Sequence, residues 1–311
     1  MLREVRKIAS DIKTMRVRGA GKIAREAARA LAIVAERSKA RNSEEFIREI
    51  SEASRLLLST RPTAVSLSNA IQFVVRGLKK EEDLSVLRTT VRNRAEEFIK
   101  SSLEAVKRIG EIGAKRLRDG DVVLTHCNSQ AALSVIITAF KQGKKIEAFV
   151  TESRPRLQGW LSARQLLAAG VPTTMIVDSA VRFIMKEIDK VIVGADSIAS
   201  NGAVVNKIGT SQIALAAHEA RVLFFVAAET YKFHPRTLIG ELIEIEERDP
   251  EEVIDIKKFP GLKVRNPAFD ITPPEYVDLI ITERGIIPPS AAYSVMKEVF
   301  GWELFGSSSG I

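Results

Sequence analysis

The stretch Asp121-Val-Val-Leu-Thr125-His-Cys-Asn-Ser-Gln130-Ala-Ala-Leu-Ser-Val-Ile-Ile137 decides the fold. Its first five residues form a short apolar run that predicts a buried strand, and its last seven predict a helix. Ligands of open α/β sheets bind beyond the carboxyl ends of strands. Residues 126–130, which join this strand to this helix, therefore face a candidate site.

Cys127 is the only cysteine of the chain and lies in this junction. The N–H groups and dipole of a helix N-terminus lower the pKa of a nearby thiol, which favours a reactive thiolate. A free cysteine is also among the most buried residue types and often only packs. Position alone leaves both interpretations open.

Further short apolar runs alternate with helical patterns after Gly120. Continuous β-branched runs joined by helices are typical of a parallel sheet covered on both faces. We therefore predict a Rossmann-like α/β domain over residues 119–311. Its expected strands are Val122–Thr125, Ile146–Val150, Thr174–Val177, Val191–Val193, Val222–Val226 and Leu279–Ile281.

The preceding residues, 1–118, predict a helical N-terminal domain. Apolar residues recur at 3–4 spacing from Ala24 to Ser38, Ser43 is a candidate N-cap, and a long amphipathic stretch runs from about Ser85 to Leu117. Arg118-Asp-Gly120 ends that stretch and marks the expected domain boundary.

The composition is that of an ordinary globular protein, with 311 residues, 45% hydrophobic and 28% charged. No run of about 18 apolar residues and no apolar signal-peptide core occurs, so we expect a cytoplasmic protein without a membrane partner. One cysteine and three histidines make a structural zinc site improbable. The net charge of +8 fits anionic small molecules at least as well as nucleic acid, because basic residues are spread among acids.

A second acid follows a predicted strand, since Lys190-Val-Ile-Val-Gly194 is followed by Ala195 and Asp196. A partly buried carboxyl group at a strand end can donate a proton. An Asx-turn or helix cap is the commoner role of such an aspartate.

Several polar or glycine-rich segments are candidate anion sites. In Asn206-Lys-Ile-Gly209-Thr-Ser, Asn206 and Lys207 can bind anionic oxygens, and the N–H groups of Gly209-Thr-Ser lie at a helix start. Arg16-Val-Arg18-Gly-Ala-Gly21-Lys22 also precedes a helix. Taken alone, the first segment fits a capped helix start better, whereas capping and phosphate binding explain the second equally well. Neither a P-loop nor GxGxxG is present.

Further basic residues end helices or follow strands. Arg61 is either a phosphate ligand or a partner of a helix C-terminus. Arg154, Arg156 and Lys232 place cations near the expected sheet edge, although surface loops often have this composition. His126 adjoins the thiol, but neighbouring residues of an extended segment point to opposite faces, which disfavours a Cys–His pair.

Taken together, the motifs resemble the superfamily of sugar-phosphate isomerases related to translation initiation factor 2B. The resemblance spans nearly the whole chain. It rests on Arg18-Gly-Ala-Gly21, Arg61-Pro-Thr-Ala-Val65, Thr125-His-Cys-Asn-Ser129, Thr151-Glu-Ser-Arg-Pro155, Gln158-Gly159, Gly194-Ala-Asp196, Asn206-Lys-Ile-Gly-Thr210 and Asn266-Pro-Ala-Phe-Asp270.

Three branches of this superfamily differ at few positions. Regulatory subunits generally lack the cysteine–aspartate pair, whereas this chain has Cys127 and Asp196. Methylthioribose-1-phosphate isomerases usually carry Arg after the aspartate, where this chain has Ser197. The chain is most similar to archaeal ribose 1,5-bisphosphate isomerases, including Ala228-Glu-Thr-Tyr-Lys-Phe-His-Pro235 and Thr282-Glu-Arg-Gly-Ile-Ile-Pro288.

The resemblance implies conversion of ribose 1,5-bisphosphate to ribulose 1,5-bisphosphate in AMP breakdown that supplies RuBisCO. It implies Asp196 as the acid for ring opening and Cys127, as thiolate, as the base at C2, with no metal or cofactor. It also implies a homo-oligomer, either a dimer or a hexamer. The implied substrate-binding residues are Arg18, Gly19, Ala20, Gly21, Arg61, Ser129, Gln130, Ala131, Asn206, Lys207 and Lys232.

Overall fold

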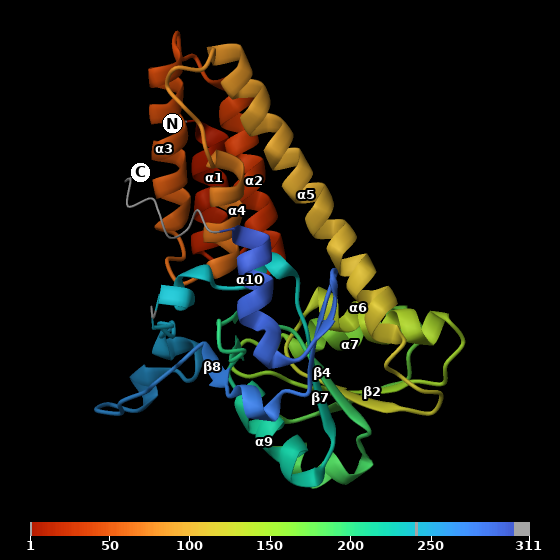
Figure 1. Ribbon diagram of the computed structural model, residues 1–311. Helices are drawn as coiled ribbons and strands as arrows, with labels where there is room; N and C mark the ends of the chain where they lie inside the picture. The colour runs from red at the N-terminus through yellow and green to blue at the C-terminus, as the bar shows by residue number, and fades with distance from the viewer. Residues whose placement is uncertain (1, 240–241, 302–311) are drawn as a thin grey trace. The chain divides into compact units, whose positions relative to one another are not determined.

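The computed structural model describes residues 2–239 and 242–301. These residues form two compact units, and the division falls between residues 104 and 105. That division lies inside the long helix α5 (Leu84–Ala114), whereas the expected boundary followed the helix (Figure 1). The last turns of α5 belong to the second unit because Ile109 and Ala114 pack into its core.

The first unit is helical, as the periodicity predicted. Four helices precede α5: α1 (Arg3–Lys13), α2 (Ala20–Arg37), α3 (Ser43–Leu58) and α4 (Val65–Val75). Helix α2 packs against each of the other three. Its buried face is rich in alanine, which allows close approach of neighbouring helices.

One expected helix cap differs from the observed one. Asn42, not Ser43, is the N-cap of α3, and its Oδ1 accepts a hydrogen bond from Glu45 N at 2.9 Å. The Ser43 hydroxyl instead donates to Glu82 O at 2.6 Å. Asparagine and serine cap helices about equally well, so the spacing alone did not distinguish them.

The second unit contains a seven-stranded sheet in the order β10-β9-β7-β4-β1-β2-β3 (Figure 1). All six expected strands are present and run parallel. They are β1 (Val122–Thr125), β2 (Glu147–Thr151), β3 (Thr173–Ile176), β4 (Lys190–Val193), β7 (Leu223–Ala227) and β9 (Leu279–Thr282). The short β10 (Gly285–Ile287), which sequence reasoning missed, pairs antiparallel with β9.

Helices cover both faces of this sheet, as expected for parallel strands. On β4, Val191 and Val193 point into the apolar cluster that includes α8 (Val181–Ile184), α9 (Thr210–Ala220) and α10 (Ala292–Phe300). Ile192 points into the opposite cluster, formed with α6 (Gln130–Lys141), α7 (Gly159–Ala168) and the end of α5. This two-sided burial explains the continuous apolar runs.

A second, three-stranded antiparallel sheet was not expected. It consists of β5 (Ser197–Ile198), β6 (Val204–Lys207) and β8 (Phe269–Thr272) in that order. Its central strand contains Asn206 and Lys207. Short 3-10 helices complete the unit: η1 (Asp178–Ala180), η2 (Met185–Glu187), η3 (Thr230–Lys232), η4 (Pro235–Ile239), η5 (Pro250–Glu252), η6 (Ile256–Lys258), η7 (Pro274–Tyr276) and η8 (Pro289–Ala291).

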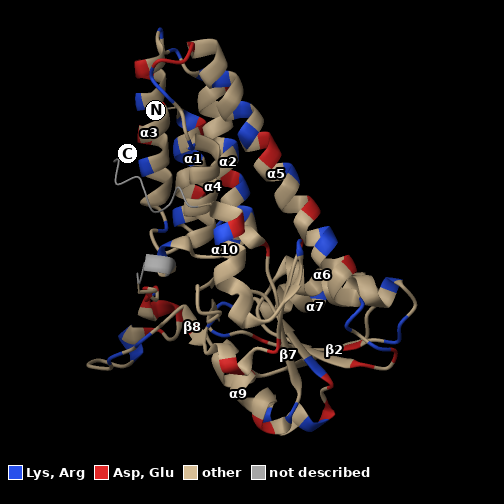
Figure 2. Ribbon diagram, in the orientation of Figure 1, with Lys and Arg blue, Asp and Glu red and all other residues tan. Residues whose placement is uncertain are grey.

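Charged residues of both signs are interleaved along α5 (Figure 2). Lys107 lies 3.9 Å from Glu111, one turn further along the helix. The basic surplus is therefore not gathered into a single-sign stripe on this helix. Among the described residues, no helix is long and apolar enough to cross a membrane.

Candidate functional site

The crevice between β1 and β4 is the topological switch point of the large sheet. The chain runs from β1 to β2 and β3 on one side and then returns to place β4 on the other side of β1. In open α/β sheets, ligands bind at such a point, outside the carboxyl ends of the strands. Cys127 follows β1 and Asp196 follows β4, so the fold brings the two predicted catalytic residues to this crevice.

The backbone of Cys127 is held in the left-handed region, with φ of 65°. Its N–H donates to Ser153 Oγ at 2.8 Å, and its carbonyl accepts from Ser162 Oγ at 2.6 Å. Ser153 follows β2 and Ser162 lies on α7, so the neighbouring strand-to-helix loop fixes the orientation of this half-buried cysteine.

Burial raises the pKa of the Cys127 thiol to about 11. The Lys207 ammonium and, more weakly, the Arg248 guanidinium lower this pKa, and the Asp196 carboxylate raises it. The expected lowering by the α6 N-terminus does not prevail, because the cost of a buried anion is larger. Burial thus favours the protonated thiol in the unliganded chain, and the catalytic thiolate that the resemblance implies stays a prediction.

Helix α6 begins at Gln130, three residues beyond Cys127. Ser129 is its N-cap, and the Ser129 hydroxyl accepts from Ala132 N at 3.3 Å. Gln130 is exposed and donates through Nε2 to Gln165 Oε1 at 2.9 Å, whereas Ala131 is buried. These three predicted binding residues thus form the first turn of a helix that starts at the crevice.

Asn206 and Lys207 are buried on β6. Asn206 Nδ2 donates to Thr210 Oγ1 at 3.0 Å, and Lys207 Nζ donates to Ala268 O at 2.8 Å. The Lys207 ammonium also lies 4.9 Å from the centre of the Phe269 ring. Because its charge lowers the pKa of Cys127, Lys207 lies within electrostatic range of the thiol.

The N–H groups at the start of α9, an expected anion site, already have an anionic partner. Asp270 Oδ2 accepts from Gly209 N at 2.7 Å and from Ser211 N at 3.1 Å. A substrate phosphate would have to displace this carboxylate. The structure therefore favours the capped helix start, which was the other interpretation of this segment.

Lys232 follows β7, on the same sheet edge, and forms a buried ion pair. Its Nζ lies 2.7 Å from Glu229 Oε2, and both side chains are almost fully buried. Its positive charge is therefore largely neutralised within the protein.

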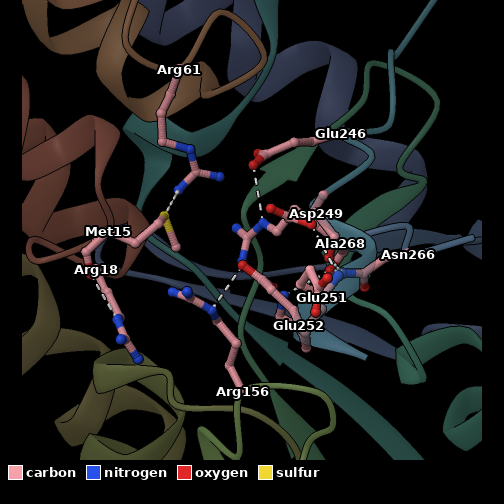
Figure 3. A network of polar contacts seen from close by, with 12 residues as sticks. Met15, Arg18, Arg61, Arg156, Glu246, Asp249, Glu251, Glu252, Asn266 and Ala268 are labelled. Carbon is pink, nitrogen blue, oxygen red and sulfur yellow. Dashed lines mark hydrogen bonds and ion pairs between the residues drawn. The ribbon is translucent and has the colours of Figure 1, made fainter. Parts of the chain in front are cut away.

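In the helical unit, the structure brings Arg18 and Arg61 to the same residue, Met15 (Figure 3). Arg18 Nε donates to Met15 O at 2.7 Å, and Arg61 Nη1 lies 3.5 Å from Met15 Sδ. Gly19, with φ of 86°, is the N-cap of α2, and Ala20 and Gly21 form its first turn. Two guanidinium groups and a helix N-terminus thus gather at one end of this unit, as a phosphate site requires.

The basic residues of the β2–α7 loop bind a neighbouring segment of the α/β unit. Arg156 Nε lies 3.0 Å from Glu252 Oε1 (Figure 3). Arg154 Nη2 donates to Val253 O at 3.0 Å. These contacts tie the loop that holds Cys127 to residues 252–253.

Sequence reasoning missed Arg248, which lies outside the named helices and strands, just before η5. Its buried side chain bonds Glu246 through Nε at 3.0 Å, and its guanidinium lies 5.7 Å from the centre of the Phe269 ring. Arg248 and Lys207 thus share one aromatic ring, and both lower the pKa of Cys127. No local motif marked this arginine, because its position depends on contacts made far away in the sequence.

His126 is buried and does not use its ring on the thiol. Ring Nδ1 lies 2.6 Å from Thr151 Oγ1 and Nε2 lies 2.9 Å from Ile208 O. Since a carbonyl only accepts, Nε2 donates to Ile208 and Nδ1 accepts from Thr151. Both nitrogens are thereby occupied, which agrees with the expectation against a Cys–His pair.

The stability of the fold is expected to fall in mild acid because of His126. Burial lowers its pKa to about 4, although Asp178 opposes this shift. Between the ordinary pKa of about 6.5 and pH 4, the unfolded chain binds a proton that the folded chain excludes. This contribution is complete above pH 6.5, and its loss through pH 4 amounts to about 3 kcal/mol at about 1.4 kcal/mol per pKa unit.

Urea unfolding of the wild type and of His126→Gln at pH 7 and pH 5 checks this. The wild type should lose about 2 kcal/mol more than the variant between the two pH values. Because both proteins contain the other titratable groups, the difference between them cancels the contribution of those groups to the pH dependence. One of them is Asp270, whose pKa is raised to about 6 by burial, so that its contribution to stability increases as the pH falls. Equal losses in both proteins would contradict the assignment.

Among the described residues, no group of three or more His, Cys, Asp or Glu side chains could hold a metal ion. The arrangement offers a thiol and a carboxyl group at one switch point, with two cations within electrostatic range of the thiol.

Comparisons with known proteins agree with the superfamily that the sequence motifs resemble. The model of the Initiation factor 2 subunit family matches residues 16–289. A ribose 1,5-bisphosphate isomerase of Pyrococcus furiosus is 56% identical over 310 residues, covering 97% of this chain and 96% of that protein. A methylthioribose-1-phosphate isomerase of Acetivibrio thermocellus is 40% identical over 307 residues, covering 93% and 90%. The crystal structure of a translation initiation factor eIF-2B of Pyrococcus horikoshii OT3 superposes with a TM-score of 0.82 at 35% identity, covering 93% of this chain and 98% of that one.

Proposed function

The chain belongs to the Initiation factor 2 subunit family and to its sugar-phosphate isomerases, and we propose that it converts ribose 1,5-bisphosphate to ribulose 1,5-bisphosphate. The observation that carries the proposal is the thiol of Cys127 and the carboxyl group of Asp196 at one switch-point crevice, with Lys207 and Arg248 in electrostatic range of the thiol. The similarity to relatives named for this reaction supports the choice of substrate.

The first step opens the sugar ring. The C1 phosphate blocks spontaneous ring opening, so the ring oxygen needs a proton donor as its bond to C1 breaks. Protonated Asp196 donates that proton. An acid at this position contributes about 10²–10⁴-fold to the rate.

The second step moves the proton of C2. Cys127, as thiolate, takes this proton as the C1–C2 double bond forms, which gives an enol-type intermediate. Protonation at C1, with loss of the proton of the C2 hydroxyl, then gives the ketose. No atom is gained or lost overall, so the reaction is an isomerisation.

The two residues are coupled through their charges. Because ionised Asp196 raises the pKa of Cys127, a protonated Asp196 favours the thiolate. The same protonation state therefore suits both roles, with an acid at the ring oxygen and a base at C2. The cations Lys207 and Arg248 stabilise the thiolate further.

Each of the two units contains candidate phosphate ligands of its own. Arg18 and Arg61 gather at Met15 in the helical unit, beside the first turn of α2 (Gly19, Ala20, Gly21). In the α/β unit, the proposed substrate ligands are Asn206, Lys207 and the first turn of α6 (Ser129, Gln130, Ala131). Lys232 is also a proposed ligand, although its ion pair with Glu229 neutralises most of its charge. A methylthio group would need an apolar pocket in place of one phosphate site.

The proposal extends to the setting of the reaction. Its substrate derives from AMP breakdown, and its product is the sugar that RuBisCO consumes. We also propose a homo-oligomer, a dimer or hexamer. Exposed apolar side chains on and beside the edge strand β3, namely Met175, Val177 and Phe183, are compatible with self-association.

Incubation of the purified chain with ribose 1,5-bisphosphate, followed by an assay of the ketose, tests the function. We expect turnover of this sugar and at least a hundredfold lower kcat/KM for methylthioribose 1-phosphate, since a missing charged contact costs about 10²-fold or more. The reverse preference would assign the chain to the methylthioribose branch. Turnover of neither sugar, with stable co-purification of initiation factor 2, would assign it a regulatory role.

A further inference from the structure

The segment Asn266–Asp270 holds the end of β6, where Lys207 lies, and the residues that follow this strand. Ala268 O accepts hydrogen bonds from Lys207 Nζ at 2.8 Å and from Ile208 N at 3.1 Å. The ring of Phe269 lies 4.9 Å from the same ammonium group. Asp270 Oδ2 then accepts from Gly209 N and Ser211 N. Three successive residues thus fix the side chain of Lys207 and the backbone that follows it, from Ile208 to Ser211.

Strand pairing reinforces these contacts. In the antiparallel pair of β6 and β8, Asn206 lies directly opposite Asp270 and Lys207 opposite Phe269. Side chains of directly opposed residues project from the same face of a sheet. Asp270 therefore reaches the residues that follow β6 from the strand that also positions Asn206 and Lys207.

The buried carboxyl group of Asp270 lowers the stability of the fold. Its Oδ1 is buried and has no hydrogen-bond partner among residues 2–239 and 242–301. An unsatisfied buried acceptor lowers stability, and burial also raises the pKa of Asp270 to about 6. Groups that weaken the fold in this way are found where function needs them.

We propose that Asp270 is a positioning residue of the isomerase. Its carboxylate holds Gly209 and Ser211 so that the ammonium group of Lys207 stays within electrostatic range of Cys127. The effect on turnover rests on the proposed function. The effect on the reactivity of the Cys127 thiol does not rest on it, because this effect acts through the charge of Lys207 and not through the substrate.

The single cysteine makes the thiol a specific reporter. Far below its pKa, the rate of alkylation by iodoacetamide is proportional to the thiolate fraction, so a rise of one pKa unit slows the reaction about tenfold. We expect Asp270→Ala to slow alkylation of Cys127 at pH 8 by about three- to tenfold, and Lys207→Met to slow it at least as much. Asp270→Asn should restore most of the rate, because its amide oxygen still accepts from both N–H groups.

This result separates positioning from a simple charge effect. Loss of a negative charge alone would make alkylation faster, so unchanged or faster alkylation in Asp270→Ala would overturn the proposal. Asp278→Ala is the matched control, since Asp278 Oδ2 likewise accepts a backbone hydrogen bond, from Phe224 N at 2.7 Å, at the other end of the strands. Its alkylation rate should equal that of the wild type.

Turnover gives the second measurement. In Asp270→Ala, kcat/KM for ribose 1,5-bisphosphate should fall about tenfold, mainly through KM, because a misplaced binding group weakens substrate binding. If Asp270→Ala is too unstable to purify, Lys207→Met is compared with the wild type at pH 8. In that variant, an alkylation rate equal to or above the wild-type rate would overturn the proposal, because the Lys207 ammonium group would then not act on the thiol. If the wild type does not turn over this sugar but Asp270→Ala still slows alkylation of Cys127, only the proposed function is rejected, and the positioning role of Asp270 stands.

Discussion

Replacement of Cys127 by serine is expected to lower kcat for ribose 1,5-bisphosphate by about 10²–10⁴-fold, the range typical of a lost general base. Serine keeps the shape of the side chain, but its hydroxyl is a far weaker acid than a thiol and does not ionise near neutral pH. The backbone of residue 127 is held by Ser153 and Ser162 through its N–H and carbonyl groups, which serine retains. The variant should therefore fold normally and still bind substrate.

Steady-state kinetics with the purified variant measures this effect. Circular dichroism and the thermal midpoint should match those of the wild type, and KM should change by less than a few-fold. Cys127→Ala provides a second comparison, because it removes the polar atom altogether. A Cys127→Ser protein with full activity would show that the thiol only packs, which was the alternative for a lone buried cysteine.

The central strands of the large sheet were predictable because they are buried on both faces. Such strands produce continuous apolar runs, as in Val191–Val193, where every residue is buried. The second sheet has no comparable pattern. Strand β5 has only two residues, and β6 contains Asn206 and Lys207, whose polar character predicts a loop. These strands form because residues far apart in the sequence pair with each other.

The candidate catalytic residues were predictable from strand ends, since the carboxyl edge of a parallel sheet is where ligands bind. The environment of these residues was not predictable from the sequence. The pKa of Cys127 depends on burial and on Arg248, which lies 121 residues further along the chain in irregular structure. Likewise, only the fold reveals that Asp270 occupies the N–H groups at the start of α9.

Replacement of Asp196 by asparagine is expected to reduce kcat by about 10²–10⁴-fold while making Cys127 more reactive. The amide cannot donate a proton to the ring oxygen as an acid does, so ring opening slows. The ionised carboxylate raises the pKa of Cys127, so its removal lowers that pKa and speeds alkylation by iodoacetamide at pH 8. Kinetics and alkylation of the same preparation measure both effects.

The two measurements together distinguish a catalytic carboxyl group from a structural one. If Asp196 served only as an Asx-turn or helix cap, asparagine would replace it well, because its amide oxygen accepts the same hydrogen bonds. Isomerisation would then remain near the wild-type rate. If Asp196→Asn folds, is alkylated faster at Cys127 and yet does not isomerise the sugar, then its base, Cys127, is more ionised and its acid is missing. Only loss of the proton donor explains that combination, and an active Asp196→Asn protein would exclude it.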